Sequence, residues 1–295
     1  MSGELEGLLV ILSINTIYAY GVFLAASSGQ LNLGAAGFVT LGAYASGYLT
    51  NGFDGLGLSI VLGIPIAVLF VGTIAFLISF PILRTRGVYM VLATFAFAEV
   101  VAGVVINAEF LGGAAGMPVE VFIPFYVVII SAVAVAVLCF YFMSTRFGLA
   151  MRSVHDDESV AILFGVNARM VRVWAFTLGG ALLAFGGALY GHHYSYVETQ
   201  NFNMLLSIYI LLYVLLGGTQ TALGPFIGAL FFTFVPELLK AFGSAVGQRW
   251  IEDGRLVAFG LIIVLMMVFR PEGIVTRTML TKMFTRKSRA LEAGE

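Results

Sequence analysis

The residues of this 295-residue chain that could do chemistry give no sign of ATP binding, of a disulfide or of a metal cluster. There is no G-x-x-x-x-G-K-[ST] phosphate-binding loop, so the chain does not bind ATP by that motif. The single cysteine, Cys139, lies in an apolar run and can form neither an intrachain disulfide nor a metal cluster. His192 and His193 are adjacent, and neighbouring helix residues do not share a face, so a two-histidine metal site is not expected. We predict no catalytic residue, no metal and no cofactor in this chain, and a lipid-headgroup or docking-protein contact for the histidines.

Polar residues inside apolar segments suggest transport instead. Burying a polar group away from water costs several kcal/mol unless it is paired, so such side chains face protein or an aqueous path. The candidates for a solute path are Gln30, Asn32, Tyr44, Thr94 and Glu99. Intramembrane acids are functional by default, which makes Glu99 the sharpest candidate, although a protonated, hydrogen-bonded acid is an alternative. For the other four, hydrogen bonds that only hold helices together are the alternative.

Two glycine-rich clusters are expected to break helices. Gly29 and Gly34 flank the polar residues of the first cluster, and broken helices often line transport routes. The second cluster contains Gly217, Gly218, Gly224 and Pro225. A close packing seam between two subunits explains the second cluster as well as a hinge does.

The composition of the chain places these residues in a membrane protein. Hydrophobic residues make up 60% of the chain, charged residues make up 11%, and the mean hydropathy is +1.01. A soluble domain has about 45–50% apolar and about 25% charged residues. The net charge of −1 gives no sign of nucleic-acid binding. The chain is therefore predicted to lie in a lipid bilayer, with no nucleic-acid partner.

The apolar segments predict an all-α, polytopic bundle of about eight to ten transmembrane helices. A helix that crosses the hydrocarbon core needs about 20 apolar residues. The nine candidate segments are 8–27, 31–50, 57–81, 88–107, 122–143, 171–191, 203–217, 221–240 and 255–270. The second and eighth segments are rich in glycine and polar residues, so we expect them to be broken or re-entrant. Residues 1–276 are assigned to one transmembrane domain and residues 277–295 to a cytoplasmic tail.

The basic residues predict the orientation of the bundle. With the C-terminus inside, the twelve on the cytoplasmic side are Arg84, Arg86, Arg146, Arg152, Arg169, Arg172, Arg270, Arg277, Lys282, Arg286, Lys287 and Arg289. Outside lie the remaining three of the 15, Lys240, Arg249 and Arg255. The positive-inside rule therefore favours an N-terminus outside and a C-terminus in the cytoplasm.

The longest connection between the predicted crossings, residues 144–170, is expected to contain a short surface helix. Acidic residues precede an apolar turn there, and Gly165 follows it, which is the usual pattern of a helix start and stop. A solvated connector is the plain explanation. Such a connector does not need exposed Leu163 and Phe164, however, so the loop is predicted to contact a partner.

Five segments carry recognisable motifs in a fixed order. They are AASSGQLNLGAAGFVTLGAYASGYL (25–49), LRTRGVYMVLATFAFAEVV (83–101), FGLAMRSVHDDESVAILFGVNARMVRVWAFTLGGALLAFGGALYG (147–191), LLGGTQTALGPFIGA (215–229) and FGLIIVLMMVFRPEGI (259–274). Together they resemble the LivH/LivM-type permeases, the membrane subunits of branched-chain amino acid ABC importers, and the LivM branch more than the LivH branch.

The resemblance implies an ABC importer permease fold, a set of partner subunits with separate roles, and a location in a particular membrane. Two permease subunits, the second a paralogue, would form the pore of an importer in the cytoplasmic (inner) membrane of a bacterium or archaeon. Two cytoplasmic ATPase subunits would bind Mg-ATP and drive alternating access, and a periplasmic or extracellular solute-binding protein would deliver the solute. Branched-chain amino acids are the expected substrate, and urea, amides or aromatic acids are alternatives. A stand-alone secondary carrier, or a channel or structural subunit, is the alternative class.

Within this resemblance, the 144–170 loop would dock on the ATPase. The general pattern of such loops has Glu-Ala-Ala followed by Gly, whereas here Ser159, Val160 and Ala161 align with it and the glutamate lies one place earlier. The residues expected to contact the ATPase or to shape the loop are Arg152, Asp157, Glu158, Ala161 and Gly165.

Overall fold

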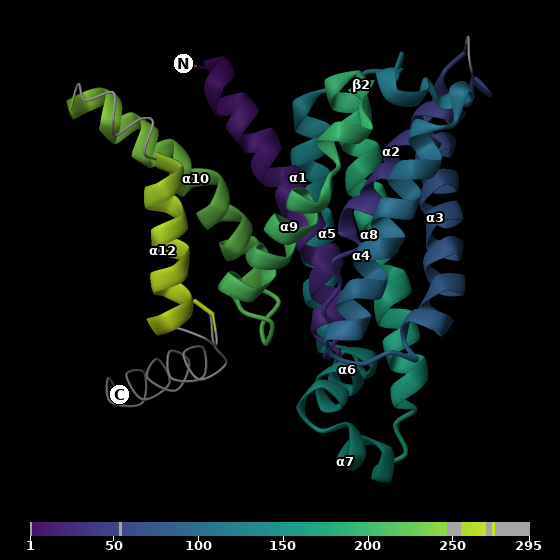
Figure 1. Cartoon of the computed structure of the whole chain (residues 1–295), viewed down its shortest axis with the longest axis vertical. Helices are drawn as coiled ribbons and strands as arrows, with labels where there is room; N and C mark the ends of the chain where they lie inside the picture. Colours follow the sequence, from purple (N-terminus) through teal and green to yellow (C-terminus); the bar gives the residue numbers. More distant parts are fainter. Residues whose placement is uncertain (1, 53–54, 247–254, 270–272, 275–295) are drawn as a thin grey trace, which may run out of the picture. The chain divides into compact units, whose positions relative to one another are not determined.

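The computed structural model describes residues 2–52, 55–246, 255–269 and 273–274 (Figure 1). It divides into two compact units, unit 1 (Met1–Leu211) and unit 2 (Leu212–Glu295). The tail proposed for residues 277–295, the basic residues within it, and Arg249 and Arg270 lie outside the described residues. The domain boundaries at 276 and 277 therefore stay a prediction.

Unit 1 is built from long helices with short irregular connections. Its helices are α1 (Ser2–Ala26), α2 (Ala35–Thr50), α3 (Ile60–Ile82), α4 (Val88–Ile106), α5 (Phe125–Ser144), α6 (Arg146–Asp156), α7 (Glu158–Leu163), α8 (Ala168–Tyr194) and the start of α9 (Met204–Gly217). Short 3-10 turns lie at Glu109–Leu111, Gly113–Ala115 and Thr199–Asn201. Two short antiparallel strands, β1 (Met117–Pro118) and β2 (Tyr196–Val197), pair Met117 with Val197. Unit 2 contains the end of α9, then α10 (Gly224–Val246) and α12 (Arg255–Phe269).

Each of the nine apolar segments forms a helix in the described residues, which confirms the all-α, polytopic fold. In the part of the chain that the structure describes, six helices are long and apolar enough to cross a membrane. Helix α2 is shorter, with 16 residues, because it begins only at Ala35 after a non-helical stretch. Helix α10 is long enough but carries Glu237 and Lys240 in its second half. The second and eighth segments are thus each one continuous helix, which begins at Ala35 and at Gly224, so a break inside either helix is not seen. Whether either segment is re-entrant stays a prediction.

Helix α8 lies at the centre of unit 1, and glycines allow three helices to approach it closely. A Cβ at Gly179 would overlap the backbone of Gly21 in α1, and one at Gly187 would overlap the backbone of Val39 in α2. A Cβ at Gly180 would lie 2.8 Å from the Ala75 Cβ in α3. Small residues let membrane helices pack backbone to backbone, where dispersion replaces the missing hydrophobic driving force. The glycine pairs of α8 therefore fix the positions of the helices that carry the candidate path.

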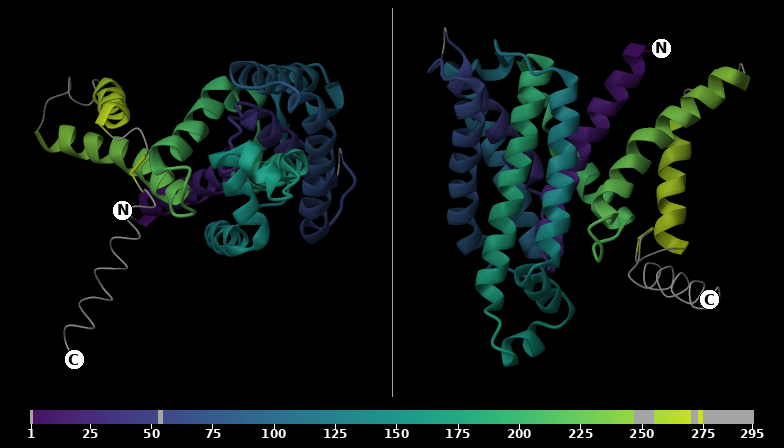
Figure 2. Two further views of the ribbon diagram at one scale, coloured as in Figure 1. Left: turned by 90° about the horizontal axis from the view of Figure 1, so that it is seen from below. Right: turned by 180° about the vertical axis from the view of Figure 1, so that it is seen from behind.

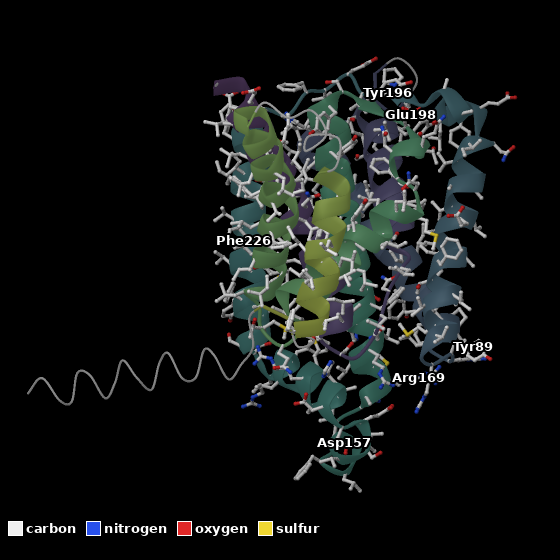
Figure 3. The ribbon with its side chains drawn as sticks, turned by 60° about the vertical axis from the view of Figure 1, so that its left-hand side comes forward. Tyr89, Asp157, Arg169, Tyr196, Glu198 and Phe226 are labelled. Carbon is white, nitrogen blue, oxygen red and sulfur yellow. The ribbon has the colours of Figure 1, made fainter. Side chains whose placement is uncertain are left out.

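The two ends of unit 1 differ in charge. Helices α6 and α7 and the turn between α3 and α4 form one end, here called the basic end, and β1 and β2 lie at the opposite end (Figures 1 and 2). Asp157 and Arg169 mark the basic end and Tyr196 and Glu198 the opposite end in Figure 3. All the Lys and Arg residues of unit 1 belong to the basic end, namely Arg84, Arg86, Arg146, Arg152, Arg169 and Arg172. This separation of charge is the one that a positive-inside protein needs.

The adjacent histidines hold the connection that follows β1. His192 Nδ1 lies 3.2 Å from the Val121 carbonyl, and His193 Nδ1 lies 2.9 Å from the Ile123 carbonyl. His192 is fully buried, so a headgroup or docking contact for this residue is wrong. Both histidines belong to the packing of the opposite end.

Candidate solute path and coupling loop

The chain breaks its helical path between α1 and α2, at residues 27–34. The hydroxyls of Ser27 and Ser28 donate to the carbonyls of Leu24 and Ala25, each at 2.9 Å, and so occupy the last acceptors of α1. Gly29 follows with φ +81°, a left-handed conformation that suits glycine at the end of a helix. Local chemistry therefore ends α1 here, and the break is a built feature of the fold.

Gln30 is a deeply buried amide of the break. Only 1% of the residue is exposed. Its Nε2 donates to the Ser28 hydroxyl at 2.7 Å and to the Arg172 carbonyl of α8 at 2.9 Å. Within the described residues, its Oε1 has no hydrogen-bond partner. A buried carbonyl oxygen without a partner costs free energy, so this atom is positioned to accept a bond from water or a solute.

Side chains from neighbouring elements satisfy the free amides at the start of α2. The Leu33 amide donates to Thr94 Oγ1 of α4 at 3.0 Å. The Gly34 amide donates to Asn32 Oδ1 at 2.7 Å, and the Ala36 amide donates to the hydroxyl of Ser207 in α9 at 2.8 Å. Ala36 lies in the first turn of α2, whose amides have no intrahelical acceptor, so the Ser207 hydroxyl satisfies one of them. The other two bonds satisfy amides of the irregular segment before α2.

The structure brings only part of the predicted path together. Gln30, Asn32 and Thr94 all lie at the break. Tyr44 lies on α2 towards the opposite end, where its hydroxyl is 3.0 Å from Thr199 Oγ1 and is fully buried. For all four residues, hydrogen bonding that stabilises the bundle is present, and contact with a solute stays a prediction.

Glu99 lies away from the break, on the outward face of α4. Its neighbour Ala98 is buried against Gly37 of α2, whereas Glu99 itself is exposed. Among the described residues, no hydrogen bond or ion pair reaches its carboxylate, so the alternative of a bonded acid within this chain has no support there. An acid in the middle of a membrane helix needs a polar surrounding, which must come from outside unit 1.

A small cleft contains polar residues that the sequence interpretation missed. A cleft of about 100 Å³ near the opposite end is lined by polar side chains of Asn15, Tyr18, Tyr190, Tyr194 and Asn201, together with apolar residues. The Tyr190 ring packs 4.6 Å from Tyr194, measured between centroids. The available signal was periodicity: Asn15 and Tyr18 are three apart and Tyr190 and Tyr194 four apart, so each pair shares a helix face.

The coupling loop contains a capped helix, as its acids and glycine predicted. Asp157 Oδ1 accepts bonds from the amides of Ser159 at 2.8 Å and Val160 at 3.1 Å, which caps α7. Gly165 ends the helix with φ +82°. The helix presents Leu163 and Phe164 to the surroundings, 86% and 84% exposed. These two side chains form an apolar tip on the basic end.

The remaining loop residues have roles inside unit 1. Ala161 is only 3% exposed, so it packs the short helix against the bundle. Glu158 forms two hydrogen bonds to the Arg172 guanidinium, at 2.8 and 3.0 Å, and lies 3.6 Å from Arg86. Arg152 is half-buried on α6. The structure therefore assigns shaping roles to Asp157, Glu158 and Ala161, while contact with an ATPase stays a prediction.

The second glycine cluster forms a tight turn within unit 2. A Cβ at Gly217 would overlap the Gly224 backbone, and one at Gly224 would overlap Gly218. Gly218 itself has φ +110°. Pro225 occupies the first turn of α10, where its missing amide costs nothing. A seam between two subunits is therefore not needed to explain this cluster, because α9 and α10 of one chain already require it.

Comparison with known proteins assigns a family. A family model described as a branched-chain amino acid transport system permease component matches residues 5–269. The chain is 27% identical to the high-affinity branched-chain amino acid transport system permease protein LivM of Escherichia coli K12, over 85% of this chain and 65% of that protein. It is 23% identical to the probable LivM of Methanocaldococcus jannaschii, over 81% of this chain and 75% of that protein.

The matches extend to the paralogous branch but not to solved structures. The E. coli K12 permease protein LivH is 28% identical over 50% of this chain and 46% of its own length. The chain spans about 65% of the length of the E. coli LivM protein. No solved structure matches the chain.

Proposed function

Because the chain belongs to the family of branched-chain amino acid transport system permease components, we propose that it is a membrane-spanning subunit of an ATP-binding-cassette importer. The observation that carries this proposal is the exposed apolar tip of α7, Leu163 and Phe164, at the basic end of a helical membrane bundle. Large apolar side chains exposed on a capped, rigid helix in an aqueous region mark a protein contact.

The partner at the basic end is a cytoplasmic ATPase. The concentration of arginine there supports a cytoplasmic location for this end, with the N-terminus of the chain outside and the C-terminus inside. This chain has no phosphate-binding loop, so Mg-ATP binds to the partner, of which the importer contains two copies. Nucleotide-driven motion of the partner then moves α7 as a rigid body and drives alternating access.

The solute path runs from the tyrosine and asparagine cleft towards the break at 27–34. Amides and phenols lie among the apolar side chains that line the cleft, and Gln30 Oε1 is available at the break. Such neutral groups suit a zwitterionic or neutral solute that passes without tight binding. Branched-chain amino acids fit this description, and so do urea, amides and aromatic acids, so selection lies mainly with a solute-binding protein that docks at the opposite end.

A paralogous permease subunit completes the pore in the inner membrane. The exposed carboxylate of Glu99 on α4 supports this assignment, because a lipid-facing acid would be costly and a second subunit would enclose it.

The test is uptake of radiolabelled leucine into proteoliposomes. They carry this chain with its co-expressed permease, ATPases and binding protein, with and without competing urea and aromatic acids. Uptake that requires ATP and is blocked only by branched-chain amino acids supports both class and substrate. ATP-dependent uptake of another solute keeps the class and replaces the substrate, while uptake by this chain alone without ATP overturns the importer assignment.

A further inference from the structure

We infer that Glu158 is a positioning residue that transmits movement of α7 to the helix break at residues 27–34, through Arg172. This inference rests on the proposed function, because it assumes that an ATPase moves α7. It goes beyond that function by assigning the route inside this chain. The carboxylate of Glu158 faces arginines of its own chain, which is the contact that this inference uses.

The first step of the route is the ion pair between Glu158 and Arg172. Both carboxylate oxygens accept bonds from the guanidinium, at 2.8 and 3.0 Å. The two side chains are only 26% and 22% exposed. A paired, two-bond contact of this kind is stronger and more directional than an exposed ion pair. Movement of α7 therefore pulls on the second turn of α8.

The second step is the bond between α8 and the break. The backbone carbonyl of Arg172 accepts the 2.9 Å bond from Gln30 Nε2. The same residue thus binds α7 through its side chain and the break through its backbone. Gln30 is buried and rigidly placed, so a displacement of the Arg172 carbonyl changes the position of the break directly.

A weaker, second arm ends at the same place. Arg86, in the turn before α4, lies 3.6 Å from Glu158, and its side chain is 80% exposed. Helix α4 then carries Thr94, whose hydroxyl caps the Leu33 amide of the break. Because exposed ion pairs contribute little, the Arg172 arm is the principal one.

A purely structural ion pair makes a different prediction. It would stabilise the loop, and its loss would lower stability without changing how the break responds to nucleotide. The two roles separate when the response of the break is measured directly. Leu31 is a suitable reporter position, because it lies within the break and is 43% exposed.

The experiment uses the assembled transporter, with Cys139→Ala to remove the one cysteine of this chain and Leu31→Cys as the reporter. Labelling is read from the band of this chain alone, so cysteines of the partner subunits do not contribute. The rate of Leu31→Cys modification by a water-soluble maleimide is measured without nucleotide and with Mg-ATP. We expect a several-fold change in rate with Glu158 present, and loss of that change in Glu158→Gln. The swap of Glu158→Arg with Arg172→Glu should restore the change, since the exposed Arg86 can swing away. Arg86→Gln is the matched control and should retain most of the nucleotide-dependent change in labelling rate.

The outcomes are distinct. A nucleotide-dependent change in labelling rate that persists in Glu158→Gln overturns the inference. The inference is also overturned if the reporter complex with Glu158 intact transports solute but its labelling rate at Leu31→Cys does not change with Mg-ATP. If Glu158→Gln does not assemble, Arg172→Lys keeps the charge and removes the paired bonds, and it should reduce the change; an undiminished change overturns the inference. If the unmutated chain neither binds an ATPase nor transports, the proposed function fails and this inference fails with it.

Discussion

The hydroxyl of Thr94 in α4 accepts a hydrogen bond from the backbone amide of Leu33, 3.0 Å away, and so caps the irregular segment before α2. The same hydroxyl donates to the Val91 carbonyl at 2.9 Å, and Thr94 is fully buried. One side chain therefore connects two membrane helices at the point where one of them is interrupted.

Replacing Thr94 by valine should destabilise the bundle. Valine has nearly the same shape but leaves the part-buried Leu33 amide without an acceptor, and a buried donor that loses its acceptor costs about 1–3 kcal/mol. The measurement is thermal unfolding of the purified chain in detergent. Thr94→Ser keeps the hydroxyl and should stay close to the unmutated protein; equal losses in the two variants would mean that the methyl group, and not the hydrogen bond, matters.

The apolar tip of α7 should supply affinity for the ATPase. Burying a large apolar side chain contributes about 1.5–3 kcal/mol, so Leu163→Ala and Phe164→Ala should each weaken ATPase binding roughly tenfold or more. Titration of the purified ATPase against the permease complex measures this. Asp156→Ala is a suitable control in the same loop, because its side chain is 67% exposed and lies outside the tip. Unchanged affinity in both tip variants would remove α7 as the docking element.

Gly165 should tolerate asparagine but not tryptophan. Its φ of +82° disfavours most side chains, and no described atom lies near an added Cβ, so the protein should still insert with either residue. Asparagine adopts this conformation readily, whereas tryptophan adds strain and bulk beside the tip. We expect Gly165→Trp to hydrolyse ATP without matched transport and Gly165→Asn to remain coupled. The ratio of ATP hydrolysed to leucine transported is the measurement, and normal coupling in Gly165→Trp would contradict the role of the loop.

The sequence predicted α7 well because its signals are local. Asp157 and Gly165 act within a few residues of the helix they bound, and their chemistry does not depend on the rest of the fold. The partner of Gln30 was beyond such reasoning, because Arg172 is 142 residues away and contributes a backbone carbonyl. Polarity inside an apolar segment indicates that a residue needs a partner, but it does not identify the partner.

Glu99 shows a related limit of sequence interpretation, which concerns the direction in which a side chain faces. The sequence places an acid inside a membrane helix, and only the packing of Ala98 against Gly37 reveals that the acid points out of unit 1. The cleft was missed because its members are spread over α1, α8 and the segment at 199–206. Residue type alone cannot assemble a cavity from three elements.

The cleft should affect solute affinity and not coupling. Asn15→Ala and Tyr190→Phe remove polar groups from its lining, so the KM for leucine uptake should rise several-fold while ATP-dependent coupling is retained. Tyr141→Phe is the matched control, since Tyr141 is 72% exposed on α5 and outside the cleft. An unchanged KM in both cleft variants would place the solute elsewhere.

Glu99 should be needed for assembly of the pore rather than for folding of this chain. Placing a charged side chain at the centre of a lone membrane helix costs about 2.5–3.5 kcal/mol, so Glu99→Leu should insert and fold at least as well as the unmutated chain. The same change should lower recovery of the paralogous permease on co-purification and reduce uptake. The reason is that polar groups of the second subunit that enclose the Glu99 carboxylate would be left without it. Val100→Leu, at a 64% exposed neighbouring position, controls for added bulk on α4. Full assembly and full uptake in Glu99→Leu would show that this face of α4 meets neither the second subunit nor the solute path.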